Sequence, residues 1–141
     1  MEDNRRKKNK KARLLVAEDE SFVLETLVNF LELNGFDVIA ARDGGEALKK
    51  FEDEGGDVDL LFLDVTMPEL NGFEVYESIK KRFGPRPVIF SSGYSLEHTF
   101  AKAPHDTPKN FIQKPFPLDE LLVFIKELIF EKGKGMAPRI G

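Results

Sequence analysis

The chain has 141 residues, of which 41% are hydrophobic and 33% charged, a composition typical of one globular domain with a buried core. It contains no cysteine, which excludes disulfide bonds, cysteine-ligated zinc and thiol nucleophiles and favours a reducing compartment. No apolar run approaches the roughly 18 residues that a membrane-spanning helix needs, and no apolar segment follows the charged N-terminus as in a signal peptide. We therefore expect a cytoplasmic protein without membrane insertion.

The net charge of −4 hides a strong asymmetry along the chain. Of the 21 basic residues, 7 lie within residues 1–13, and the rest of the chain carries 14 Lys and Arg against 23 Asp and Glu. Such a basic run can bind nucleic acid or an anionic surface, but no aromatic or helical pattern accompanies these charges. We interpret residues 1–12 as a solvated basic tail or a linker, and we expect no nucleic-acid partner.

Five short apolar runs alternate with helix-period segments after residue 13, which predicts a doubly wound parallel sheet with helices on both faces. The runs lack the polar–apolar alternation of half-exposed strands, so we expect strands that are buried on both faces. The predicted strands are Leu14–Ala17, Val38–Ala41, Leu60–Leu63, Val88–Phe90 and Phe111–Ile112.

Apolar stripes with helical spacing separate these runs. The first covers residues 23–31, with Ser21 as a possible N-cap and Gly35 just past its end. Shorter stripes over residues 47–51 and 73–83 predict the second and third helices.

The last part of the chain contains one clear helix and one weak segment. Pro117 suits the first position of a helix whose apolar face continues to Ile129 and which ends near Glu131. Residues 96–110 have room for only a short or irregular fourth helix, because prolines interrupt them. We expect one domain over residues 13–131 and a flexible tail over residues 132–141.

Acidic residues follow two of the predicted strands. Glu18 and Asp19 come after the first strand and Asp64 after the third. In the flavodoxin-like strand order 2-1-3-4-5 these strands are neighbours, so the carboxylates converge. Carboxylates that close together repel unless a cation lies among them, and oxygen ligands favour Mg²⁺, or Mn²⁺, over zinc. His98 and His105 fall in the irregular segment, away from this cluster.

The last two strands end in a hydroxyl and an ammonium group, carried by Ser92 and Lys114. Carboxylates with a cation, a hydroxyl and an ammonium around one point form a site for a tetrahedral anion such as a phosphoryl group, with Asp64 as a possible nucleophile. Taken singly, Asp19 could be a helix cap, Ser92 a turn residue and Lys114 a surface charge. Their joint placement favours the phosphoryl site.

Four segments resemble the receiver domain of two-component response regulators, with a fold like that of the chemotaxis regulators. They are LLVAEDE (14–20), LLFLDVTMPELNGFEV (60–75), VIFSSGY (88–94) and FIQKPF (111–116), and the resemblance runs from about Arg13 to Glu131. The serine-rich end of the third segment also resembles receivers attached to hybrid sensor kinases.

The resemblance implies that Asp64 accepts a phosphoryl group from a phosphohistidine on a histidine kinase or a histidine phosphotransfer protein. It implies Mg²⁺ held by Glu18, Asp19, Asp64 and the backbone carbonyl of Thr66. It also implies a regulatory domain that promotes its own phosphotransfer and dephosphorylation and is not an enzyme in its own right.

Other positions follow from the same resemblance. Lys114 is expected to pair with the phosphoryl oxygens, and Ser92 is expected to hydrogen-bond one of them. The peptide bond from Lys114 to Pro115 is expected to be cis. Movement of Ser92 and Phe111 then changes the surface of the short fourth helix, the fifth strand and the last helix, where a downstream partner binds. Phe111 lacks a tyrosine hydroxyl, so its rotation changes packing only.

Two other functions remain open. A haloacid-dehalogenase-like phosphatase also uses an Asp nucleophile with Mg²⁺ and a Lys, but Thr66 stands where that family needs a second carboxylate. A receiver-fold binding module without phosphotransfer is the other, and the intact Asp19, Asp64 and Lys114 argue against it.

Overall fold

The computed structural model describes residues 11–130. The strands are β1 Arg13–Ala17, β2 Asp37–Ala41, β3 Leu60–Asp64, β4 Val88–Ser92 and β5 Phe111–Gln113. The helices are α2 Ser21–Leu33, α3 Gly44–Asp53, α4 Gly72–Phe83, α5 Leu96–Phe100 and α6 Leu118–Phe130. The predicted C-terminal tail, the helix end near Glu131 and nearly all of the predicted basic tail lie outside the described residues.

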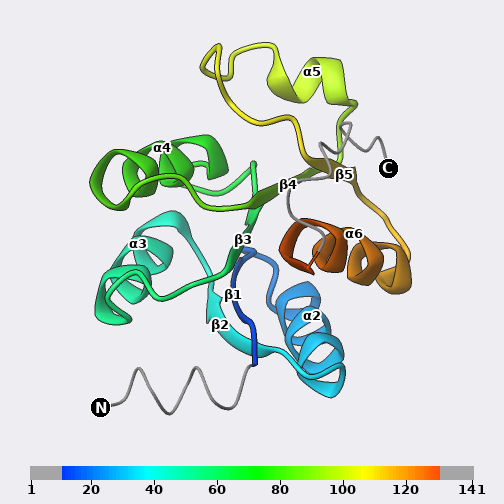
Figure 1. Ribbon diagram of the computed structural model, residues 1–141. Coiled ribbons are helices and arrows are strands. Elements are labelled where there is room, and N and C mark those ends of the chain that lie inside the picture. The colour runs from blue at the N-terminus through cyan, green and yellow to red at the C-terminus, as the bar shows by residue number, and fades with distance from the viewer. Residues whose placement is uncertain (1–10, 131–141) are drawn as a thin grey trace.

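All strand pairs are parallel, and the sheet order is β2-β1-β3-β4-β5, which confirms the predicted flavodoxin-like topology. Helices α2 and α6 cover one face of the sheet, and α3, α4 and α5 lie over the other (Figure 1). Each face has its own apolar core, because the inner strands bury side chains on both sides. None of the helices among residues 11–130 is long and apolar enough to cross a membrane.

The five predicted strands are all present, each within two residues of its observed bounds. The expectation that every strand is buried on both faces is wrong for β2, in which only Ala41 is fully buried. Among the described strands, β2 lies at an edge of the sheet and pairs only with β1. The predicted short fourth helix is confirmed as α5, a single stretch of five residues. His98 lies within this helix, in the segment that was predicted to hold only a short or irregular helix.

Side chains cap the starts of α3, α4 and α5, and at α5 the Ser95 side chain accepts a hydrogen bond from the N–H of His98. Asp43 accepts a hydrogen bond from the N–H of Glu46 at the start of α3, and Asn71 forms a capping box with Glu74 at the start of α4. The predicted N-cap role of Ser21 is wrong, because Ser21 is already the first residue of α2 and no side chain caps this helix. Prolines are tolerated at helix starts, and the last helix begins one residue after Pro117.

Candidate functional site

The parallel pairing of β1 with β3 brings two acidic strand ends together. Ala17 pairs with Leu63, so the residues that follow β1 lie beside the end of β3. Glu18, Asp19 and Asp64 each offer a carboxylate oxygen, and these oxygens lie within 4.8 Å of one another. Glu18 and Asp64 are buried, whereas Asp19 is exposed at the mouth of the cluster.

Burial and mutual repulsion make this cluster unfavourable when it is fully ionised. Burial first and the charge of Glu18 second raise the pKa of Asp64 from 3.8 to about 7, against the opposing effects of Lys114 and the N–H of Thr66. Either a proton or a cation must therefore compensate the charge. A set of carboxylate oxygens fits a hard divalent cation such as Mg²⁺ or Mn²⁺.

Lys114 is the cation that the chain itself supplies. Its Nζ lies 2.8 Å from Glu18 Oε1 and 3.3 Å from Asp64 Oδ2. Burial lowers the pKa of Lys114, but the hydrogen bond and charge of Glu18 together with those of Asp64 raise it overall, so the group stays protonated. The peptide bond from Lys114 to Pro115 is cis.

The loop after β3 holds the Asp64 carboxylate from its own backbone. The N–H of Thr66 donates to Asp64 Oδ1 at 3.1 Å, while the Thr66 side chain is exposed. A Cβ atom added at Gly72 would lie 2.7 Å from the Asp64 carbonyl oxygen, so only glycine allows this approach. The loop is also packed against α3, because a Cβ atom at Gly44 would lie 2.5 Å from Leu70.

Ser92 lies at the end of β4, next to β3 in the sheet. Its side chain is buried, and its Oγ accepts a hydrogen bond from the N–H of Tyr94 at 3.1 Å. Its carbonyl accepts from the N–H of Lys114 at 2.8 Å, so β4 also positions the residue that carries the ammonium group. Ser92 therefore links the site to the start of the β4–α5 connection.

Phe111 is fully buried in the core beneath α5. Its ring meets that of Phe100 edge-to-face, with centroids 5.8 Å apart. Phe100 in turn contacts Phe73 and Phe90. An aromatic cluster thus connects β5, which precedes Lys114, with α5 and with α4.

The structure also forms an apolar groove that the sequence analysis missed. The groove has a volume of about 390 Å³ and lies between the start of α2 and the β5–α6 connection that carries Lys114. Phe22, 79% exposed, lies at its rim, and Pro115 and Phe116 belong to its wall. Phe22 falls outside the apolar stripe of its helix. An aromatic residue at such a position was the feature of the sequence that could have predicted an exposed apolar surface here.

The family model of the response regulator receiver domain matches residues 14–126. Sensor kinase CckA of Brucella abortus is 38% identical over 118 residues, which are 84% of this chain and 12% of that protein. Response regulator RR06 of Streptococcus pneumoniae is 38% identical over 116 residues, which are 82% of this chain and 52% of that protein. The chain thus spans about half or less of the length of these two relatives.

Two other comparisons cover nearly the whole of the matched chain. Chemotaxis protein CheY of Bacillus subtilis is 30% identical over 118 residues, which are 83% of this chain and 97% of that protein. The crystal structure of a response regulator receiver domain protein from Clostridium thermocellum is 28% identical with a TM-score of 0.77, covering 86% of this chain and 96% of that one. This chain therefore belongs to the response regulator receiver domain family, the phosphoacceptor domains of two-component signalling.

Proposed function

We propose that Asp64 is the phosphoacceptor and that it takes its phosphoryl group from a phosphohistidine on a histidine kinase or a histidine phosphotransfer protein. The observation that carries this proposal is the placement of the buried Asp64 carboxylate beside Glu18 and within reach of Lys114, with its pKa raised to about 7. Glu18, Asp19, Asp64 and the carbonyl of Thr66 are the proposed ligands of Mg²⁺. When bound, this cation neutralises the charge that gathers on the phosphoryl oxygens.

The transfer requires little chemistry from the chain beyond positioning and charge. A carboxylate oxygen of Asp64 forms a bond to phosphorus while the bond from phosphorus to the imidazole nitrogen breaks, and that nitrogen keeps the electron pair. The N–H of Thr66 holds Asp64 Oδ1, which leaves the other oxygen on the side of Lys114. Lys114 is then placed to pair with a phosphoryl oxygen, and Glu18 keeps the ammonium group protonated and oriented.

The response to phosphorylation runs through Ser92 and Phe111 in this proposal. The Ser92 hydroxyl turns towards a phosphoryl oxygen, and the buried Phe111 ring repacks against Phe100. Because Phe100 lies in α5, this repacking changes the surface of α5, β5 and α6, to which a downstream partner binds. Phe111 has no hydroxyl, so the change is one of packing and not of hydrogen bonding.

The apolar groove beside Lys114 is the proposed docking place of the phosphodonor. Its walls come from α2 and from the β5–α6 connection, so a helix that enters it brings a phosphohistidine next to Asp64. The exposed Phe22 supplies an apolar anchor at its rim. Phe22→Ser is expected to slow phosphotransfer from the protein donor and to leave labelling by a small acyl phosphate unchanged.

Labelling by a small acyl phosphate in the presence of Mg²⁺ tests the phosphoacceptor directly. Intact mass is expected to show one phosphoryl adduct on the parent and on Asp53→Ala, an exposed control position, and none on Asp64→Ala. Lys114→Ala is expected to be labelled weakly and to lose the conformational response. An adduct of undiminished yield on Asp64→Ala would exclude this site.

The same reaction separates the proposal from a phosphatase. A regulatory phosphoacceptor keeps one phosphoryl group per chain for an extended time, whereas a phosphatase releases many equivalents of phosphate per minute. Thr66 offers the site a backbone N–H but no carboxylate for a second acid–base step. Release of phosphate in large excess over protein would support the phosphatase.

A further inference from the structure

The outer side of β2 is the longer of the two free edges of the sheet, because β5 has only three residues. The N–H of Asp37 and the C=O of Ala41 bond to the β1 side. Main-chain groups of successive strand residues point in opposite directions along the sheet. Those of Val38, Ala40 and Arg42 therefore point outward, where no strand lies within residues 11–130.

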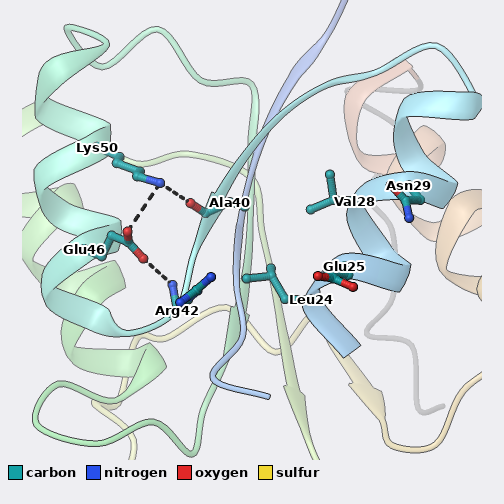
Figure 2. Close-up of a pocket in the computed structure, with 8 residues that line it drawn as sticks. All are labelled: Leu24, Glu25, Val28, Asn29, Ala40, Arg42, Glu46 and Lys50. Carbon is teal, nitrogen blue, oxygen red and sulfur yellow. Dashed lines mark hydrogen bonds and ion pairs between the residues drawn. The ribbon is translucent and has the colours of Figure 1, made fainter. Parts of the chain in front are cut away.

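Two side chains of α3 occupy part of this edge. Lys50 Nζ donates a hydrogen bond to the Ala40 carbonyl at 2.7 Å, and Glu46 Oε1 accepts one from the N–H of Arg42 at 2.6 Å. The two side chains also form an ion pair of 3.4 Å (Figure 2). One outward acceptor and one outward donor of β2 are thus already bonded within the chain.

The helices themselves leave this edge open. A cleft of about 360 Å³ lies between α2 and α3, and β2 forms its floor (Figure 2). Glu25 and Asn29 of α2 line the wall opposite Glu46 and Lys50. The side chains of Glu46 and Lys50 therefore block the access of an incoming strand to the outer main-chain groups of Ala40 and Arg42.

We propose that Glu46 and Lys50 keep the β2 edge closed to a second copy of this chain. A free edge strand is a template for pairing with another chain, and native proteins block such edges with charged side chains. A second copy presents the same edge, so two β2 strands can pair antiparallel about a two-fold axis once the edge is open. The bonds of Lys50 to Ala40 and of Glu46 to Arg42 use the groups that this pairing needs.

The double variant Glu46→Ala/Lys50→Ala opens the edge without a change in net charge. Its molar mass, measured by light scattering from about 10 µM to about 1 mM, is expected to rise towards that of a dimer relative to the parent. The matched control is Lys49→Ala/Asp53→Ala, which removes an exposed ion pair with the same spacing in the same helix. The control is expected to have the molar mass of the parent at every concentration.

A rescue variant tests whether the hydrogen bonds to β2 are sufficient to block association when other side chains make them. Glu46→Gln/Lys50→Arg keeps an acceptor for the N–H of Arg42 and a donor for the Ala40 carbonyl, so it is expected to behave as the parent. In the alanine variant, association is expected to slow hydrogen exchange at the amides of Val38 and Ala40. Ala40→Pro removes one outward N–H and is expected to abolish the association in that background.

Three results would overturn the proposal. One is a folded alanine variant with the molar mass of the parent, and another is equal association of the Lys49→Ala/Asp53→Ala control. The third is association that leaves the exchange of the Val38 and Ala40 amides unchanged. If the double variant does not fold, Lys50→Met against Lys50→Arg provides the same comparison at the Ala40 carbonyl alone.

Discussion

Lys114 Nζ lies 2.8 Å from Glu18 Oε1, although the Glu18 side chain has no exposed surface. A buried carboxylate is stable only with a partner, and the ammonium of Lys114 is the cation that the described part of the chain places there. The same ammonium is shared with Asp64 at 3.3 Å. The single positive charge of Lys114 thus compensates only part of the negative charge of the two buried carboxylates. The negative charge that is left can attract a divalent cation.

The first prediction concerns this shared ammonium. Lys114→Met leaves Glu18 and Asp64 without their cation, so in EDTA the free energy of unfolding is expected to fall by about 1–3 kcal/mol. Added Mg²⁺ is expected to raise the melting temperature of Lys114→Met by more than that of the parent, because it then relieves more repulsion. Thermal melts with and without Mg²⁺ measure both effects. Lys126→Met, at an exposed position of α6, is the control, and an equal Mg²⁺ response in all three proteins would contradict the argument.

The second prediction is a pH dependence of stability without divalent cations. The pKa of Asp64 is raised from 3.8 to about 7 by burial and by Glu18. Between these values the folded chain binds more protons than the unfolded chain, so this group's contribution is complete below about pH 4 and is lost as the pH rises through about 7. In EDTA, Asp64→Asn is therefore expected to gain stability relative to the parent as the pH rises from about 5 to about 8. Denaturant titrations at both pH values test this, and a difference independent of pH would refute it.

The third prediction concerns the exposed member of the cluster. Asp19→Asn removes one of the three carboxylates at little cost to the core, because the side chain lies at the surface. At Mg²⁺ ten times above the dissociation constant, binding to the folded parent adds about 1.4 kcal/mol, and we expect most of this gain to disappear in Asp19→Asn. Glu20→Gln alters the next acidic residue, which is not part of the cluster, and is expected to keep the Mg²⁺ effect. A parent melting curve that does not respond to Mg²⁺ would exclude the site.

The strands and the convergence of the acidic residues could be predicted because both depend on local patterns. Buried parallel strands need continuous apolar runs, and the sheet topology then places the ends of β1 and β3 side by side. A short segment broken by prolines likewise predicted the short α5. These features require knowledge of neighbouring residues and of one common topology, and nothing more.

Features that depend on distant residues could not be predicted in the same way. Arg13 bonds to Asp37 at 2.8 Å and to Glu54 at 2.7 Å, and its N–H donates to Asp59. No local pattern encodes a partner 24 or 41 residues away. The partial exposure of β2 was missed although the predicted strand order places it at an edge, because an apolar run does not show how far helices that are distant in sequence cover an edge strand.

The fourth prediction compares two adjacent glycines at the start of α3. A Cβ atom at Gly44 would lie 2.5 Å from both the Cβ and the carbonyl oxygen of Leu70, whereas one at Gly45 meets only Asp43 Oδ1 at 3.5 Å. Gly44→Ala is expected to destabilise the fold by about 1–3 kcal/mol through overpacking. Gly45→Ala is expected to be neutral or to stabilise by up to about 1 kcal/mol, because alanine favours a helix. Equal free energies of unfolding for the two variants would contradict the close approach of α3 to the loop after β3.

The last prediction concerns the lifetime of the phosphorylated state and depends on the proposed role of Asp64. Hydrolysis requires a water molecule in line behind phosphorus, and an amide or carboxylate nearby can orient it. We propose that Thr66 and Tyr94 flank this approach, because Thr66 follows Asp64 by two residues and Tyr94 follows Ser92 by two. The Tyr94 ring stacks on His98 with centroids 4.6 Å apart, and the backbone N–H of Tyr94 donates to Ser92 Oγ, which ties this residue to the end of β4.

A short hydroxyl arm and an aromatic ring are poorly suited to orient that water, so slow self-dephosphorylation is expected. Thr66→Asn/Tyr94→Glu supplies an amide and a carboxylate at these places and is expected to speed the decay about tenfold, equivalent to about 1.4 kcal/mol of barrier. Decay of the labelled protein is followed by intact mass in one Mg²⁺ buffer, with Lys102→Gln as the control, because it makes the same change of one charge unit as Tyr94→Glu at an exposed position. If the double variant and the parent decay at the same rate, the stacked ring does not control the water, and the geometry of the metal site sets the lifetime instead.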